Sequence, residues 1–173
     1  FRPAAEPRTH RAQILASGPI MREALRAQQI LAEKYDVAAD VWSATSYLAL
    51  RREALEIERW NRHHPDQPAR VSYVASLLDA TEGPVICVSD WMKAVPDQIA
   101  RWVRPPFVSL GTDGFGMSDT REVMRRHFEI DAGSIIIATL HQLFNQGAVS
   151  AQVVRQAMEE LEYDPEKLDP MSL

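Results

Sequence analysis

The chain of 173 residues contains a single cysteine, Cys87, so it cannot form an internal disulfide. One thiol suits a reducing compartment, and we expect the protein to be cytoplasmic. Cys87 falls within an apolar run predicted to be a buried strand, where we expect it to pack as a small hydrophobic residue. No apolar run approaches the roughly 20 residues that cross a membrane. The first residues also lack the apolar segment of a signal peptide.

Several functional signatures are missing as well. The net charge is −5 and no basic stripe is present, which argues against a nucleic-acid surface. Neither a phosphate-binding P-loop nor a nucleophile elbow occurs. His63 and His64 are adjacent and cannot share a helix face, and the other three histidines are scattered without cysteine or carboxylate spacing that would support a metal site. The residues therefore supply no self-contained catalytic set.

What the sequence does contain is an alternation of strand-like and helix-like segments. Four short apolar runs predict strands, at residues 12–16, 37–43, 85–89 and 107–110. Apolar residues at helical spacing predict helices near residues 20–35, 48–62, 72–80, 95–102, 120–128, 134–146 and 150–161. A strand, a helix and a second strand joined by short loops form a right-handed crossover, which implies a parallel sheet. The order as a whole predicts a three-layer α/β domain.

The ends of the chain differ from its centre. Residues 1–11 hold two prolines and mixed charge, which predicts a linker and suggests that another segment preceded it. Residues 12–163 form the predicted α/β domain. Residues 164–173 are polar, contain Pro165 and Pro170, and are expected to lie as a surface tail.

A glycine-rich loop, residues 111–119, joins the last predicted strand to a helix; its sequence is Gly-Thr-Asp-Gly-Phe-Gly-Met-Ser-Asp. Its glycine spacing, Gly-x-x-Gly-x-Gly, is the reverse of the dinucleotide-binding fingerprint. A helix start can hold an anion, but Asp113 and Asp119 place two carboxylates there. We expect a tight turn whose aspartates accept hydrogen bonds from loop N–H groups. Asp119 should cap the helix, with Glu122 completing a capping box.

Four further side chains are candidates for function or contact. Phe115, in the glycine loop, would suit a contact with a neighbouring domain. Asp90 and Trp91 follow the strand at residues 85–89, at the edge of the sheet where α/β proteins bind ligands, although Asp90 would more simply cap the next helix. Trp60 is either an interface anchor or a ring packed on the core beneath neighbouring arginines.

Six stretches, taken together and in order, resemble one family. They are Glu-Arg-Trp-Asn-Arg-His-His-Pro at 58–65, Arg-Val-Ser-Tyr-Val at 70–74, Val-Ser-Asp-Trp-Met-Lys at 88–93, Leu-Gly-Thr-Asp-Gly-Phe-Gly at 110–116, Ser-Asp-Thr-Arg at 118–121 and Arg-His-Phe-Glu-Ile-Asp at 126–131. The family is the homodimeric bacterial pyruvate dehydrogenase, the first component of the pyruvate dehydrogenase complex, and the resembling part is its carboxyl-terminal domain. The resemblance covers essentially the whole chain.

The resemblance implies a fold and a role. The fold would be like the transketolase C-terminal domain, with a mostly parallel five-stranded sheet between helices. The parent enzyme would decarboxylate pyruvate on thiamine diphosphate and Mg²⁺, then pass the acetyl group to lipoyl groups of the dihydrolipoyl acetyltransferase component. In the family, cofactor and metal are held mainly by two other domains at the dimer interface. The resemblance therefore assigns no catalytic, cofactor-binding or metal-binding residue to this chain, and no bound cofactor is expected.

On this interpretation the chain supports the homodimer, braces the missing catalytic domains and offers a docking surface to partners. It would be inactive by itself. Two other classes stay open. One is a free-standing interaction module with the same fold. The other is a regulatory domain that binds a small molecule or anion through the loop from Gly111 to Asp119.

Overall fold

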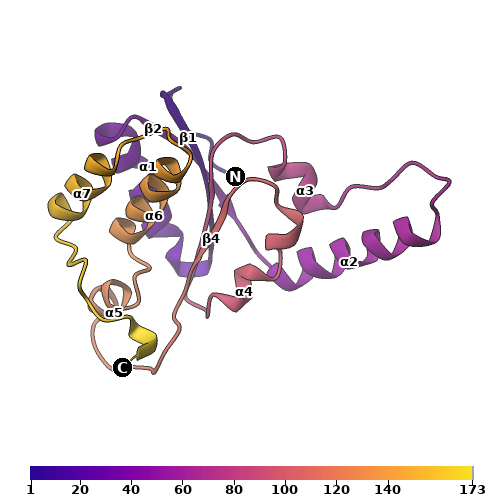
Figure 1. Cartoon of the computed structure of the whole chain (residues 1–173). Coiled ribbons are helices and arrows are strands. Elements are labelled where there is room, and N and C mark those ends of the chain that lie inside the picture. The colour runs from indigo at the N-terminus through magenta and orange to yellow at the C-terminus, as the bar shows by residue number, and fades with distance from the viewer. Residues whose placement is uncertain (173) are drawn as a thin grey trace.

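The computed structural model, which describes residues 1–172, is built around a parallel sheet with helices on both faces (Figure 1). Its strands are β1 (His10–Ser17), β2 (Val37–Ser43), β3 (Val85–Ser89) and β4 (Phe107–Leu110). They lie in the order β2-β1-β3-β4, and every pair is parallel. The predicted α/β class and parallel sheet are confirmed. The described residues form four strands, as the four apolar runs predict, rather than the five that the family resemblance implies. The β-branched run from Ile135 to Ile137 lies inside the helix Ala132–Asn145, as its spacing predicts.

Helices cover the two faces of the sheet unequally. They are α1 (Met21–Lys34), α2 (Tyr47–His63), α3 (Tyr73–Leu78), α4 (Ala94–Asp97), α5 (Arg121–His127), α6 (Ala132–Asn145) and α7 (Ala151–Glu160). In Figure 1, α1 and α6 lie on one side of the sheet with α7 packed on α6, whereas α2, α3 and α4 lie on the other. Among the residues described, no helix is long and apolar enough to cross a membrane.

The alternation of side chains along each strand divides the core in two. Ile14 of β1 and Ile86 of β3 point to the larger cluster, which α1 and α6 complete. Leu15 and Cys87, their neighbours in sequence, point to a smaller cluster beneath α2, α3 and α4. All five residues of β3 are buried, as expected for a central strand covered on both faces.

Some predicted boundaries and faces differ from the structure. The helix predicted over 95–102 is broken into α4 and a 3-10 turn at Ala100–Trp102, and Ile99, with φ −106° and a fully buried side chain, lies between them. In α2 the core-facing residues are Tyr47 and Ala54, and Leu48 is 56% exposed. The apolar spacing of a helix that covers only part of a sheet does not identify which side chains become buried.

The terminal segments lie against the domain. Arg2 pairs with Val41 in an antiparallel bridge, and the Ala4 N–H donates to Asp40 Oδ1 at 2.9 Å, so the first residues run beside the outer strand β2. Strand β1 begins at His10, two residues before its predicted start. Pro170 is buried within the otherwise exposed tail. The limits of the predicted linker, domain and tail stay predictions, and residue 173 of that tail lies outside the described residues.

Candidate functional site

All of the predicted site residues except Trp60 lie in the loops after β3 and β4, at the carboxyl edge of the sheet. The Thr112 N–H donates to the Trp91 carbonyl at 3.0 Å, and the Thr112 hydroxyl donates to the Asp90 carbonyl at 3.0 Å. Asp113 Oδ2 accepts from the Lys93 N–H at 3.1 Å. The glycine loop is therefore joined to residues 90–93 by hydrogen bonds, and the carboxylate of Asp113 already serves one of them.

The three glycines of this loop have different surroundings. A Cβ atom on Gly111 would lie 2.4 Å from the Trp91 carbonyl oxygen, so the two loops can approach only because a side chain is missing there. Gly114 has φ +108°, and a Cβ on it would lie 2.5 Å from the Pro170 carbonyl oxygen. Around Gly116 there is open space. Two of the three glycines thus shape the corner and hold the tail against it.

The expected cap of α5 by Asp119 is wrong. Thr120 has the extended backbone of an N-cap, and its hydroxyl accepts from the Val123 N–H at 3.4 Å. Asp119 Oδ1 accepts instead from the N–H of Thr120 at 2.6 Å. A capping box with Glu122 requires Asp119 as the N-cap, but the helix begins one residue later. The Asp119 carboxylate therefore accepts a hydrogen bond within the loop and does not cap the helix.

The orientation of α5 also differs from the prediction. Val123, expected to face the core, is 49% exposed, and Arg125 is buried instead, with a side chain only 8% exposed. Asp90 does not cap α4, which starts after Lys93 without any side-chain cap. The Asp90 carboxylate lies 3.7 Å from Arg125 Nε, so it forms an ion pair across the edge of the sheet.

Apolar side chains project from both loops into solvent. Trp91 is 63% exposed and Phe115 is 81% exposed. Met92 and Met117, beside them in sequence, are also more than half exposed. We call Trp91, Met92, Phe115 and Met117 the apolar rim. Sequence reasoning identified its two aromatic members; the methionines could have been found from their place in the same loops, since Met is common at adaptable contact surfaces.

Trp60 lies at the other extreme of the molecule, near the end of α2, which projects from the domain (Figure 1). Its ring is stacked on His64 at 4.4 Å, and the Arg70 guanidinium lies 3.7 Å from the ring centroid. Arg70 is positioned by Asn61, which both donates to its carbonyl and accepts from its N–H. The ring is therefore held in a local half-exposed stack outside the core clusters, and its role as an interface anchor stays a prediction.

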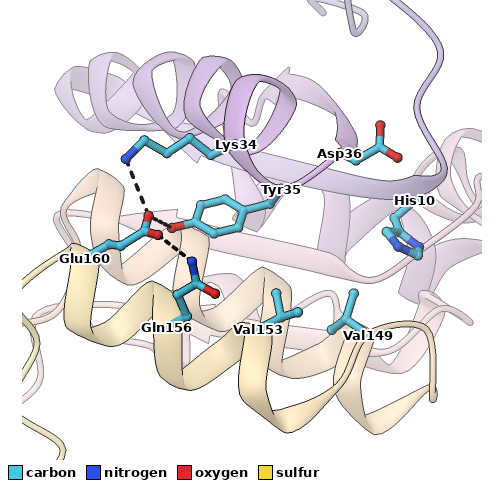
Figure 2. Close-up of a pocket in the computed structure, with 8 residues that line it drawn as sticks. All are labelled: His10, Lys34, Tyr35, Asp36, Val149, Val153, Gln156 and Glu160. Carbon is cyan, nitrogen blue, oxygen red and sulfur yellow. Dashed lines mark hydrogen bonds and ion pairs between the residues drawn. The ribbon is translucent and has the colours of Figure 1, made fainter.

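A cleft of about 560 Å³ opens at the opposite, amino edge of the sheet, between the end of α1 and α7 (Figure 2). The Tyr35 hydroxyl donates to Glu160 Oε2 at 3.2 Å, and Gln156 donates to Oε1 at 2.9 Å. Burial, and then the nearby Glu160 carboxylate, raise the pKa of Tyr35 to about 12. Hydrogen bonds from Gln156 and Tyr35 lower the pKa of Glu160. These groups satisfy one another and tie α7 to α1, which accounts for them without a ligand.

The remaining candidates for chemistry have structural surroundings. Cys87 is fully buried, as predicted, and burial raises the pKa of its thiol well above 9.0. The Tyr47 hydroxyl lies beside this thiol and has no nitrogen or oxygen partner among residues 1–172. Within residues 1–172, no group of three or more histidine, cysteine and acidic side chains could hold a metal ion. These side chains do not fit a Mg²⁺-diphosphate group, so we assign no catalytic step to the chain.

Similarity to known proteins indicates the family of the chain. The family model described as "Transketolase-like TK C-terminal domain" matches residues 2–131. The "Pyruvate dehydrogenase E1 component" of Mycolicibacterium smegmatis is 53% identical over 164 residues, covering 95% of this chain and 18% of that protein. The protein of the same name from Mycobacterium tuberculosis is 52% identical over 153 residues, covering 88% of this chain and 16% of that protein. The chain thus spans less than a fifth of these curated relatives.

More distant relatives follow the same pattern. The Escherichia coli K12 protein, also named "Pyruvate dehydrogenase E1 component", is 39% identical over 159 residues, which is 91% of this chain and 18% of that protein. A solved structure titled "Split gene transketolase, inactive beta4 tetramer" superposes with a TM-score of 0.52 at 15% identity, covering 82% of this chain and 41% of that one. At that identity the structural likeness establishes the fold alone.

Proposed function

We propose, from the premise that this chain belongs to the transketolase-like TK C-terminal domain family, that it is the C-terminal domain of a pyruvate dehydrogenase E1 component. The observation that carries the proposal is 53% identity over 95% of the chain to a protein of that name. The motifs at 58–65, 88–93 and 110–116, which carry the family resemblance, support the same assignment.

The whole enzyme would be an oxidoreductase that decarboxylates pyruvate and reductively acetylates lipoyl groups of the dihydrolipoyl acetyltransferase component. Thiamine diphosphate with Mg²⁺ supplies the carbanion chemistry when bound. We place that group in the domains that this chain does not include. The enzyme would be a cytoplasmic homodimer, and this chain would contribute to its assembly.

Within that enzyme the chain would be structural. Its glycine-loop carboxylates, Asp113 and Asp119, already accept hydrogen bonds from loop N–H groups, which leaves them less suited to a ligand. The apolar rim presents aromatic and methionine side chains of the kind that become buried at domain contacts. We propose that the rim packs against the rest of the enzyme, and that other surfaces of the domain dock partner components.

An activity comparison tests the proposal. The 173-residue chain, incubated with pyruvate, thiamine diphosphate and Mg²⁺, should release no CO₂ above buffer. The full-length enzyme that contains this domain should turn over under the same conditions, and a version that stops before the domain should lose dimer stability and activity together. Turnover by the 173-residue chain, or full activity and an unchanged dimer in the shortened enzyme, would contradict the proposed role.

A further inference from the structure

A second cavity, of about 260 Å³, lies at the carboxyl ends of the neighbouring strands β1 and β3. The chain leaves these two strands toward opposite faces of the sheet. The crossover from β1 runs through α1 to β2, whereas the connection from β3 runs through α4 on the opposite face to β4. In open parallel sheets this arrangement leaves a crevice at the carboxyl edge, where ligands commonly bind. Pro19 after β1, Asp90 after β3 and Thr112 after β4 line the cavity, and α5 closes it.

The cavity wall is mostly apolar and includes Met124, Phe128 and Ile130, and its two cations are arginines of α5. Arg121 and Arg125, which are four residues apart and so share one face of the helix, both line the cavity. Arg125 Nε has no hydrogen-bond partner among the residues described, although this atom is buried. An unsatisfied buried N–H of a charged group is unfavourable, and it favours any ligand that can accept from it.

The Arg125 guanidinium is held in place from its other side. Its Nη1 donates to Glu23 Oε1 at 3.1 Å, while Glu23 Oε2 accepts from the Ala132 N–H at 3.1 Å. Both oxygens of Glu23 are therefore engaged, and they fix the arginine between α1 and α6. Such support by a second residue is what a preorganised binding group requires.

Asp90 is the one carboxylate in the cavity lining, and it is poorly engaged. At 3.7 Å from Arg125 Nε it is too far for a hydrogen bond. Its side chain is 39% exposed and accepts no hydrogen bond within residues 1–172, so only the ion pair with Arg125 holds it there, and an incoming oxyanion can replace that ion pair. The Nε edge of Arg125 is then available to another acceptor, with Arg121 beside it as a second cation.

We propose that this cavity binds a small oxyanion, which takes the place of the Asp90 carboxylate at the Nε edge of Arg125 and is also bound by Arg121. The cavity is below the roughly 300–1,000 Å³ typical of sites for drug-sized ligands. The ligand is accordingly of the size of inorganic phosphate or a short carboxylate. This site is separate from the glycine-loop carboxylates, and it does not depend on the proposed function.

Titrating the ¹⁵N-labelled 173-residue chain with phosphate, and separately with acetate, tests the proposal. Sodium chloride at matched ionic strength controls for screening. One of the two oxyanions should give saturable amide shifts centred on Thr112, Arg121 and Arg125, with a Kd on the order of 1 mM. The anion that saturates identifies the ligand class. Shifts that are absent, or that chloride reproduces, would overturn the site.

Substitutions with opposite expected signs separate this site from general electrostatics. R121Q should weaken binding about tenfold, the factor for losing one charge-assisted hydrogen bond. D90N should strengthen it several-fold, because the competing carboxylate is removed. R51Q on the exposed surface of α2 and D66N in the loop after α2 make the same charge changes elsewhere, and should leave the Kd unchanged.

Arg125 itself is tested with R125K, which keeps the charge but loses the planar fork. If R125K keeps the wild-type melting temperature, it should still weaken binding. If it unfolds, R121Q and D90N decide the question. An unchanged Kd in both of those variants would contradict the proposal.

Discussion

At the scale of single residues, the three glycines of the loop at residues 111–119 have different structural roles. Gly111 lies against the Trp91 carbonyl, Gly114 combines a positive φ with contact to the Pro170 carbonyl, and Gly116 is free on its side-chain side. In the sequence these three residues form one glycine-rich signal. The motif therefore predicts where the chain turns, but the different roles of its three glycines depend on how the neighbouring loops pack against them.

Alanine substitutions of these glycines should have unequal effects. G111A and G114A should each lower the free energy of unfolding by about 1–3 kcal/mol, since backbone atoms must move to admit the new Cβ. G116A should stay within about 0.5 kcal/mol of the wild type, as an exposed substitution does. Urea unfolding of the three variants would measure this. Equal losses would show that the loop relaxes freely and that these contacts do not constrain it.

Cys87 makes a residue-scale prediction about pH. Its pKa in the folded chain is raised above the ordinary value of 9.0 by burial. Below pH 9 both folded and unfolded thiols are protonated, so the thiol contributes no pH dependence there. Above pH 9 the unfolded thiol ionises first, and stability should fall by up to about 1.4 kcal/mol per pH unit.

The comparison of wild type with C87A isolates this contribution. C87A will be less stable at all pH values because it leaves a small cavity, but its stability should decline less steeply between pH 9 and 10. Tyr47 and Tyr163 also have raised pKa values, so both proteins should lose stability above pH 10. Identical slopes from pH 9 to 10 would mean that the Cys87 thiol ionises in the folded chain.

At the scale of elements, the start of α5 shows how a one-residue shift changes roles. Asp119 and Thr120 are both good capping residues, and local sequence rules favoured the aspartate through Glu122. The structure uses Thr120, and α5 then presents Arg125 rather than Val123 to the interior. The buried arginine is acceptable because Glu23 of α1 and Asp90 after β3 lie beside it. Neither partner is close to it in sequence.

T120A should destabilise the chain by about 1 kcal/mol through loss of the helix cap, and D119A should cost less. Thermal unfolding of the two variants would compare them, with T45A as the control, an exposed threonine whose hydroxyl makes no hydrogen bond among the residues described. A larger loss of stability in D119A than in T120A would instead show that Asp119 caps the helix, as a capping box with Glu122 predicts.

At the scale of the whole molecule, the apolar rim is the feature that the isolated chain does not explain. Trp91, Met92, Phe115 and Met117 are exposed together on two joined loops, although apolar groups of this size gain free energy by burial. The chain spans less than a fifth of its curated relatives, so most of such a protein lies outside it. The rim would be covered in the longer protein that we propose.

Replacing both aromatic rim residues tests that view. W91S with F115S should leave the melting temperature of the isolated chain nearly unchanged, since both rings are already in solvent. In the full-length enzyme the same pair should weaken dimer assembly, measured by sedimentation at nanomolar to micromolar concentrations. L48S, which removes an exposed apolar side chain from α2, serves as the matched control. Unchanged assembly in the double variant would remove the rim from the interface.

Local chemistry in the sequence determined the class of this protein and most of its elements. The β-branched run at 85–89 predicted the central strand because a strand covered on both faces has few polar positions. Helical spacing placed α1, α6 and α7, and the combination of motifs identified the family. Each of these signals depends on residues close together in the chain, so one sequence was enough to find them.

Tertiary structure alone decided which groups meet at the carboxyl edge. The Glu23–Arg125–Asp90 cluster joins residues up to 102 positions apart, and the approach of Gly111 to the Trp91 carbonyl depends on how two loops pack. Periodicity could not reveal the buried arginine, because its burial follows from partners on other elements that neutralise the charge. The sequence determined the elements and the family, and the packing of distant segments made the cavity and left the rim exposed.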